Sequence, residues 1–520
     1  MAALIAGIPA SLAATGTLVR PERMDLRSSG RVIGFVNLPA GTRVEVIGST
    51  NGTYQVRRNP DETPFAIPGD SLRLDQPASP PTPDITPAPD PSPVASTPAA
   101  PPPPSPGCST SAAPANTEPA AAEVNRAMGI PLFGTGSLWE ESDAIAANRL
   151  RWPQESKNSR ETGYRRYPYT FNSETRVFGV RALCLFLQGL GDKTARASIL
   201  FANKGDIAFY MSPEEAARQR PDEPLNVTDG MLRAFQEALR ADAGKLRNGL
   251  RELLGPSRIV SLGRFQQIRE QAERWDWRGT SFLLVHQPNE YLMLRIVPTA
   301  GLDDDSPRKA FAKAKASLAS RVERRPNGDV LVGDLPMVDQ GRKGYCVPAT
   351  FERLLRYYGL PADMNILAMA GKTEAGGGTS ISRILAATHG MIYDAGGTIT
   401  PRNFTGSIQE IKPLIDAGKP LIFAHYSTEE FNKRVNGRME RRVAITNWDD
   451  WAAKFLPALA KGPPLKPDPQ CGHVCLIIGY NGRTREIAIT DSWGPAATER
   501  WMTEGEARQI MQPTGLSVIE

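Results

Sequence analysis

A cysteine, a distant histidine and a distant aspartate are the residues of this chain best suited to chemistry. Cys346 comes directly before a run whose apolar residues recur at helical spacing, with Pro348 in the first turn. A thiol at a helix N-terminus meets unpaired backbone N–H groups and the positive end of the helix dipole, and both favour the thiolate. Cys346 is therefore a candidate nucleophile.

His473 opens one apolar run and Asp491 closes the next. The turn at 481–483 separates the two runs, which predicts a β-hairpin whose open end brings His473 beside Asp491. A carboxylate in that position holds an imidazole ready to take the proton of a nucleophile. Gln340, just upstream of Cys346, supplies an amide that, with the Cys346 backbone N–H, can donate hydrogen bonds to an oxyanion. These four residues predict nucleophilic catalysis at a carbonyl carbon.

The same motifs, in this order, resemble those of papain-clan cysteine peptidases. The segment from Gln340 to Cys346 matches the oxyanion and nucleophile segment, His473 and its strand match the histidine segment, and 491–494 match the third catalytic residue with its shielding tryptophan. Asp491 stands where papain has an asparagine, and in this the sequence resembles the branch of bacteriocin double-glycine leader peptidases. The resemblance covers about residues 327–520. It implies a papain-like fold, a Cys346 thioester with His473 as general base and acid, and a peptide or protein substrate; no cofactor is expected.

The resemblance does not identify the substrate. Tyr345 and Val347 differ from the residues that flank papain's cysteine, and we recognise no transporter segment of the kind fused to leader peptidases. Gly377, Gly378 and Trp493 are candidates for binding substrate, with a flexible turn as the alternative for the glycines. Alternatives for the function are a catalytically silent papain-like domain that binds a peptide or cell-surface ligand, and an amidase or transglutaminase of the same clan.

The chain of 520 residues is too long for one core and is expected to be a multidomain α+β protein. Residues 17–75 alternate between polar and apolar among Gly, Pro and Asn-Gly turns, which predicts a small β-barrel. This segment resembles bacterial Src-homology-3-like domains, which implies a role in binding a cell-envelope ligand, with a simple structural appendage as the alternative. Residues 76–125 are rich in Pro and Ala and predict an extended linker.

Two further domains are expected after the linker. Residues 126–326 combine strand patterns with an amphipathic helix over 228–254, and we expect an α+β domain, with an autoinhibitory pro-domain as one hypothesis for its role. Residues 327–520 form the papain-like peptidase domain. Within it, a charged insertion at about 426–470 precedes His473 and is expected to be a lid or substrate wall, or an ordinary surface excursion.

Composition and charge exclude several classes of partner. The net charge of +5 is spread over mixed basic and acidic residues, so no nucleic acid is expected. The five cysteines lack the spacing of a zinc site or a disulfide framework, so no metal is expected. No apolar run is long enough to span a membrane. Residues 1–16 predict the remnant of a signal peptide or a simple tail. The first favours an extracytoplasmic or secreted location, and the second a cytoplasmic one.

Overall fold

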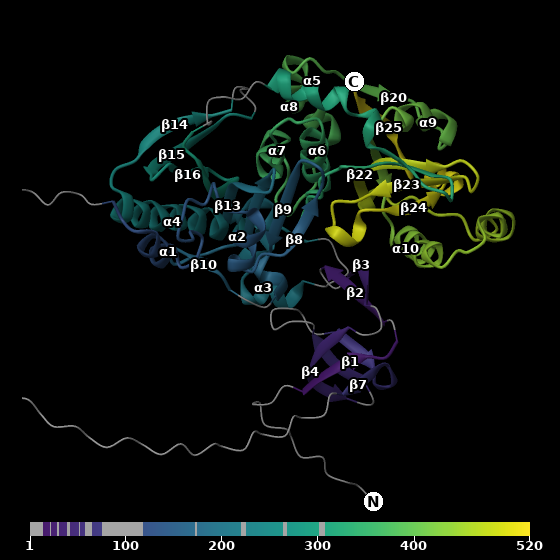
Figure 1. Cartoon of the computed structure of the whole chain (residues 1–520), viewed down its shortest axis with the longest axis horizontal. Helices are drawn as coiled ribbons and strands as arrows, with labels where there is room; N and C mark the ends of the chain where they lie inside the picture. Colours follow the sequence, from purple (N-terminus) through teal and green to yellow (C-terminus); the bar gives the residue numbers. More distant parts are fainter. Residues whose placement is uncertain are drawn as a thin grey trace, which may run out of the picture. The chain divides into compact units, whose positions relative to one another are not determined.

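The structure, a computed structural model of the whole chain, describes most residues between Ala14 and Leu74 and nearly all after Pro119 (Figure 1). The described ranges are 14–20, 22–28, 31–38, 42–50, 53–57, 65–74, 118–171, 174–219, 225–263, 268–300 and 307–520. The tail up to residue 13 and the linker from 76 to 117 lie outside them. The described elements confirm a multi-sheet α+β protein. None of the helices in these ranges is long and apolar enough to cross a membrane.

The N-terminal unit contains a five-stranded antiparallel sheet. Its order is β6 (Phe65–Pro68), β5 (Thr53–Arg57), β4 (Arg43–Thr50), β1 (Ala14–Leu18) and β7 (Leu72–Leu74). Strand β1 thus begins inside the predicted tail. β2 (Glu22–Ser28) and β3 (Arg31–Leu38) form a separate two-stranded sheet, so this part of the barrel predicted over 17–75 does not join the five-stranded sheet. Alternation predicts that a segment is a strand, but it does not encode which strand it pairs with.

The second compact unit, Pro119–Glu520 together with a few earlier residues, begins with an eight-stranded antiparallel sheet, which we call the middle sheet. Its order is β14 (Arg258–Leu262), β15 (Glu270–Trp277), β16 (Thr280–Gln287), β17 (Tyr291–Pro298), β13 (Lys193–Asn203), β12 (Cys184–Leu190), β9 (Glu161–Arg166) and β8 (Gln154–Lys157). Together with the helices described next, this sheet forms the middle region of the chain.

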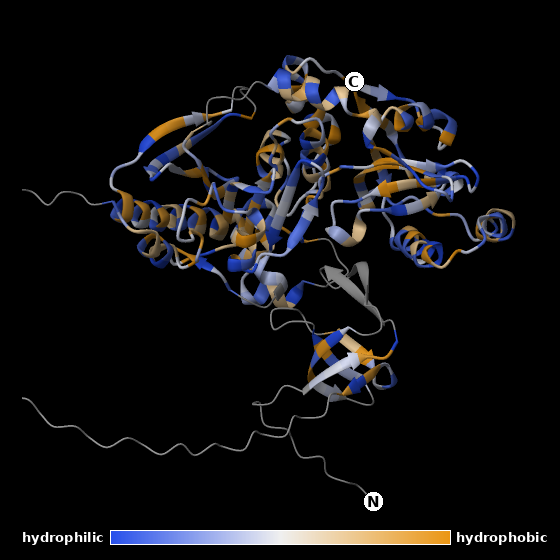
Figure 2. Cartoon of the chain, viewed as in Figure 1, coloured by the Kyte–Doolittle hydropathy of each residue, from blue (hydrophilic) through white to orange (hydrophobic). Residues whose placement is uncertain are grey.

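Two helices of the middle region compare directly with the sequence patterns. Helix α4 (Asp229–Leu254) confirms the predicted helix and starts where the Thr228 hydroxyl accepts a hydrogen bond from the Met231 backbone N–H. Figure 2 shows hydrophobic and hydrophilic residues alternating along α4, as its one buried face requires. Helix α1 (Ala121–Met128) begins inside the predicted linker because Val124 and Met128 are fully buried.

The C-terminal region contains a second large sheet. Its order is β18 (Val322–Arg324), β19 (Asp329–Val332), β22 (Gly472–Asn481), β21 (Leu421–Tyr426), β25 (Met511–Ile519) and β20 (Ile399–Arg402), and β23 (Glu486–Thr490) pairs with both β22 and β24 (Arg500–Thr503). Helix α6 (Cys346–Tyr357) lies between this sheet and the middle sheet (Figure 1). It contacts β22 through Thr350 and β9 through Arg356.

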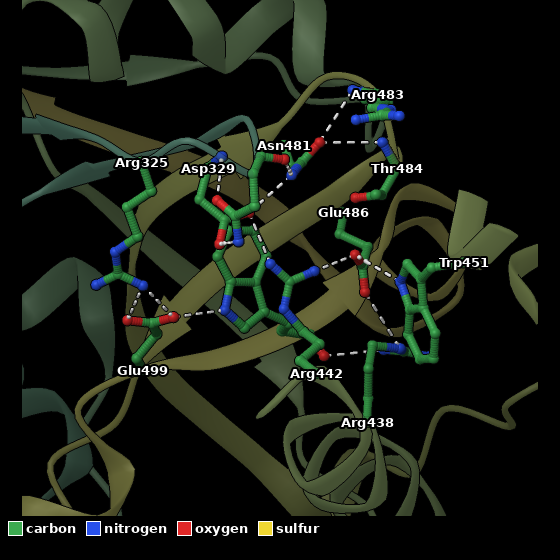
Figure 3. Close-up of polar contacts among 12 residues, drawn as sticks. Arg325, Asp329, Arg438, Arg442, Trp451, Asn481, Arg483, Thr484, Glu486 and Glu499 are labelled. Atoms are coloured by element: carbon green, nitrogen blue, oxygen red, sulfur yellow. Dashed lines mark hydrogen bonds and ion pairs between the residues drawn. The ribbon is translucent and has the colours of Figure 1, made fainter. Parts of the chain in front are cut away.

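The insertion at 426–470 is neither a lid nor a surface excursion over its first half. Helix α10 (Glu429–Val443) buries Phe431 and Val435 and directs two arginines into a cluster of buried charges (Figure 3). Arg442 lies 2.6 Å from Asp329 and also pairs with Glu486, which accepts a further hydrogen bond from the Trp451 indole at 3.2 Å. The helix is therefore part of the domain core.

Removing Arg442 should be costly because it leaves two buried carboxylates without their shared cation. We expect Arg442→Ala to lower the free energy of unfolding of the C-terminal region by about 3 to 5 kcal/mol in urea denaturation. Lys454→Ala is the control, because its ion pair with Asp450 is exposed and should contribute little. Equal effects of the two substitutions would contradict the buried-charge account.

Candidate active site

Cys346 is the first residue of α6 and is only partly buried, whereas the eleven residues after it are buried. The expected apolar face is present, but the polar residues of the other face are buried as well because sheets cover the helix on both sides. Thr350 donates a hydrogen bond to the Val474 carbonyl at 3.1 Å, and Arg353 donates one to the Thr490 hydroxyl at 2.7 Å. These two contacts hold the helix that carries Cys346 against β22 and β23.

The hairpin of β22 and β23 brings His473 and Asp491 together. His473 Nε2 lies 2.7 Å from Asp491 Oδ1, and the imidazole interacts electrostatically with the Cys346 thiol. The Asp491 side chain is fully buried, and that of His473 is 7% exposed. One helix N-terminus and one hairpin therefore assemble a thiol, an imidazole and a carboxylate in series.

Asp491 is held by a residue that sequence reasoning missed. The Arg500 guanidinium, on β24, lies 2.5 Å from Asp491 Oδ2. Two asparagines of α10 fix Arg500 in turn: Asn432 Oδ1 accepts a hydrogen bond at 2.7 Å and Asn436 Oδ1 accepts one at 3.3 Å. No local motif marks Arg500, because it reaches Asp491 only when β24 pairs with β23, and the asparagines that fix it lie 64 and 68 positions upstream.

The electrostatics of the site favour a thiolate–imidazolium pair. Burial opposes ionisation of Asp491, but the charge of Arg500 and the hydrogen bond from His473 outweigh it and hold the pKa of Asp491 well below its usual range. Burial likewise opposes protonation of His473, yet its hydrogen bonds to Asp491 and Cys346 raise the pKa of His473 to about 9. For Cys346 burial favours the neutral thiol, and the hydrogen bond and charge of His473 reverse this and lower the pKa of the thiol.

Trp493 covers the imidazole. Its ring centroid is 4.7 Å from that of His473, and the Arg500 guanidinium lies 5.1 Å from the Trp493 ring on which it stacks. This indole shields the His473–Asp491 pair from solvent while remaining partly exposed itself.

Gln340 lies on the loop that leads into Cys346. Its backbone N–H donates to the Ser492 carbonyl at 2.9 Å, which ties the loop to the turn after Asp491. Its side-chain nitrogen donates to the Lys343 carbonyl at 2.9 Å. Because a primary amide has two N–H donors, one of them remains for a substrate oxyanion.

Gly377 and Gly378 pack against the same loop. The Gly378 backbone N–H donates to the Gly344 carbonyl at 3.1 Å, and a Cβ at Gly377 would overlap the Gly344 backbone. Both glycines have positive φ, +118° and +88°. Glycine is therefore needed in this turn for more than flexibility, because the turn packs closely on the backbone of Gly344, which lies two residues before Cys346.

Comparison with known proteins gives one match. Residues 332–511 match the sequence profile of the Peptidase_C39 like family. No curated protein and no solved structure gave a significant match. The family match supports a cysteine peptidase domain of C39 type in the C-terminal region, and it spans all of the residues assembled above. Within the described ranges, no group of three or more His, Cys, Asp or Glu side chains is arranged to hold a metal ion.

The shifted pKa values predict how Cys346 and His473 titrate. The thiolate should persist below the range of a free thiol, about pH 8.5, and the imidazolium should persist until about pH 9. The ion pair therefore exists from the lowered pKa of Cys346 up to the pKa of His473, and it is lost as the pH rises through about 9. Iodoacetamide should alkylate Cys346 at a lower pH than it alkylates free cysteine, and labelled histidine signals in NMR should show the His473 imidazole titrating near 9. A His473 titration near 6.5 would contradict this.

Arg500→Gln tests the support of Asp491. Loss of the guanidinium should raise the pKa of Asp491 and weaken its hold on the imidazolium, so we expect the His473 titration to fall by roughly one pH unit or more. Arg483→Gln is the matched control, because Arg483 is 44% exposed at the hairpin turn. An unchanged His473 titration in the Arg500 variant would show that Arg500 serves packing alone.

Proposed function

We propose that this chain is a cysteine peptidase that hydrolyses peptide bonds through a Cys346 thioester. The observation that carries the proposal is the series Cys346–His473–Asp491, in which the imidazole lies 2.7 Å from a buried carboxylate and interacts electrostatically with the thiol, lowering the pKa of Cys346. The family match supports a protease in general. The roles of individual residues and the thioester are our proposal.

In the proposed first step, the Cys346 thiolate attacks the carbonyl carbon of the scissile peptide bond. The carbonyl oxygen becomes an oxyanion, to which the Cys346 backbone N–H and the free N–H of the Gln340 amide donate hydrogen bonds. The tetrahedral intermediate collapses as the C–N bond breaks, and His473 gives its proton to the departing amine. A thioester on Cys346 and a neutral imidazole remain.

In the second step, His473 takes a proton from water, whose oxygen attacks the thioester carbonyl. The second tetrahedral intermediate expels the Cys346 thiolate and releases the carboxyl product, which regenerates the ion pair. Asp491, kept ionised by Arg500, orients the imidazole through both steps. Gly377, Gly378 and Trp493 are proposed to line the substrate cleft, since the glycines pack beside Gly344 and the indole covers His473.

The proposal is tested by labelling and turnover in the full-length chain. An alkylating probe should label Cys346 in preference to Cys184, Cys471 and Cys475, and Cys346→Ala should abolish cleavage of a diverse peptide library read by mass spectrometry. Cys471→Ala is the control and should retain both, because its thiol lies outside the series of hydrogen bonds.

Each alternative function has its own outcome. Ordinary thiol reactivity at Cys346 with no cleavage in the wild-type chain would favour a silent binding domain. Release of ammonia from glutamine side chains, or transfer of the acyl group to an added amine, would favour an amidase or a transglutaminase.

A further inference from the structure

Four consecutive residues of the middle region reach into the loops around Cys346. We call Asn203–Asp206, at the junction of β13 and the following 3-10 helix, the wedge segment. Each of its residues contacts the C-terminal region next to the candidate active site, and three of the four are buried. No such contact was expected from sequence, where the middle region carries no chemical motif.

The strongest of these contacts is a buried ion pair. Lys343 Nζ lies 3.0 Å from Asp206 Oδ2, with side-chain exposures of only 1% and 3%. The Lys343 carbonyl also accepts the hydrogen bond from the Gln340 amide. A buried ammonium is costly unless it keeps its partner, so the pair restricts the Lys343 backbone to one position. Through that backbone it restricts Gln340.

A second contact restrains the residue directly before the nucleophile. The Tyr345 hydroxyl donates to Asn203 Oδ1 at 2.6 Å, and the same oxygen accepts the Gly205 backbone N–H. A Cβ at Gly205 would overlap the Tyr345 ring, so only glycine permits this approach. Tyr345 is the N-cap residue of α6, and its position sets where the helix starts.

The wedge segment also holds the other glycine loop. The Lys204 carbonyl accepts a hydrogen bond from the Gly376 backbone N–H at 3.1 Å. Gly377 and Gly378, which follow, pack on Gly344. The segment therefore bridges the two loops that flank Cys346, and it contacts neither the thiol nor the imidazole.

A broader interface keeps the wedge segment in place. Arg356 of α6 pairs with Glu161 of β9 at 2.9 Å, and both side chains are buried. The Tyr167 hydroxyl donates to the Asp339 carbonyl at 2.7 Å, one residue before Gln340. The first of these contacts is a buried pair of opposite charges, which favours a permanent junction over a removable inhibitor because separating the two regions would leave both charges unpaired.

We propose that the middle region is a positioning part of the active site, in which Asp206, Asn203 and Gly205 fix the geometry of the Gln340–Cys346 loop. This inference rests on the proposed peptidase function. The middle region acts through Lys343 and Tyr345 and is required for turnover, in contrast to an autoinhibitory pro-domain, whose removal raises activity.

The test compares two variants of the full-length chain with the wild type, on the peptide that the library identifies as cleaved. Asp206→Asn should lower kcat about a hundredfold, because a displacement of about 1 Å in a catalytic group costs roughly that factor. Alkylation of Cys346 below the pH range of a free thiol should stay within about twofold of the wild-type rate, since the ion pair with His473 is untouched. Glu290→Gln is the matched control, because Glu290 pairs with Lys204 of the same segment without touching the Gln340–Cys346 loop.

The double variant Asp206→Asn/Lys343→Met separates positioning from stability. It removes both charges, so no unpaired ammonium is left to unfold the protein, and kcat should remain at least tenfold below wild type. Wild-type kcat in the double variant would overturn the positioning role. So would a parallel loss of low-pH alkylation in both variants, because the defect would then lie in the fold or the ion pair. If the wild-type chain itself neither cleaves peptide nor is labelled selectively at Cys346, the proposed function falls first.

Discussion

The site depends on keeping a carboxylate charged in a place where water cannot solvate it. Asp491 is fully buried, and burial alone would neutralise it. Arg500 supplies the compensating charge, and the asparagines of α10 hold Arg500. With Asp491 ionised, His473 retains its proton, and with His473 charged, Cys346 ionises more readily. Each group thus stabilises the charged form of the next.

Helix α6 links this series of charges to both halves of the second unit. Its N-terminus carries Cys346, its middle contacts the hairpin through Thr350 and Arg353, and its C-terminal half meets the middle sheet through Arg356. Because sheets cover α6 on both sides, small shifts between the halves would move the nucleophile. The buried ion pairs at these contacts restrict such shifts, since separating them would leave charges unsolvated.

Local sequence patterns predicted the candidate site where its residues stand at the ends of helices or strands. The helix start after Cys346 and the hairpin between His473 and Asp491 follow from residues adjacent in sequence, and the structure places these side chains together. Arg500 could not be found in this way, because its role requires β24 to pair with β23 and α10 to pack beside it. Helix α10 itself lies in a charged insertion whose arginines suggest exposure, whereas Arg438 and Arg442 are buried against carboxylates.

The sequence by itself determined the chemical types and their local framework: a thiol at a helix N-terminus, an imidazole and a carboxylate at the open end of a hairpin, and an amide upstream. Those features depend on hydrogen-bonding patterns and periodicity within short segments. Only the tertiary structure decided that Arg500 keeps Asp491 charged and that Asn203–Asp206 borders the loop before Cys346. Lys343 and Asp206 are 137 positions apart, and Arg500, although only nine residues after Asp491, depends on asparagines 64 and 68 positions upstream. The energies of these contacts depend on burial that no local pattern encodes.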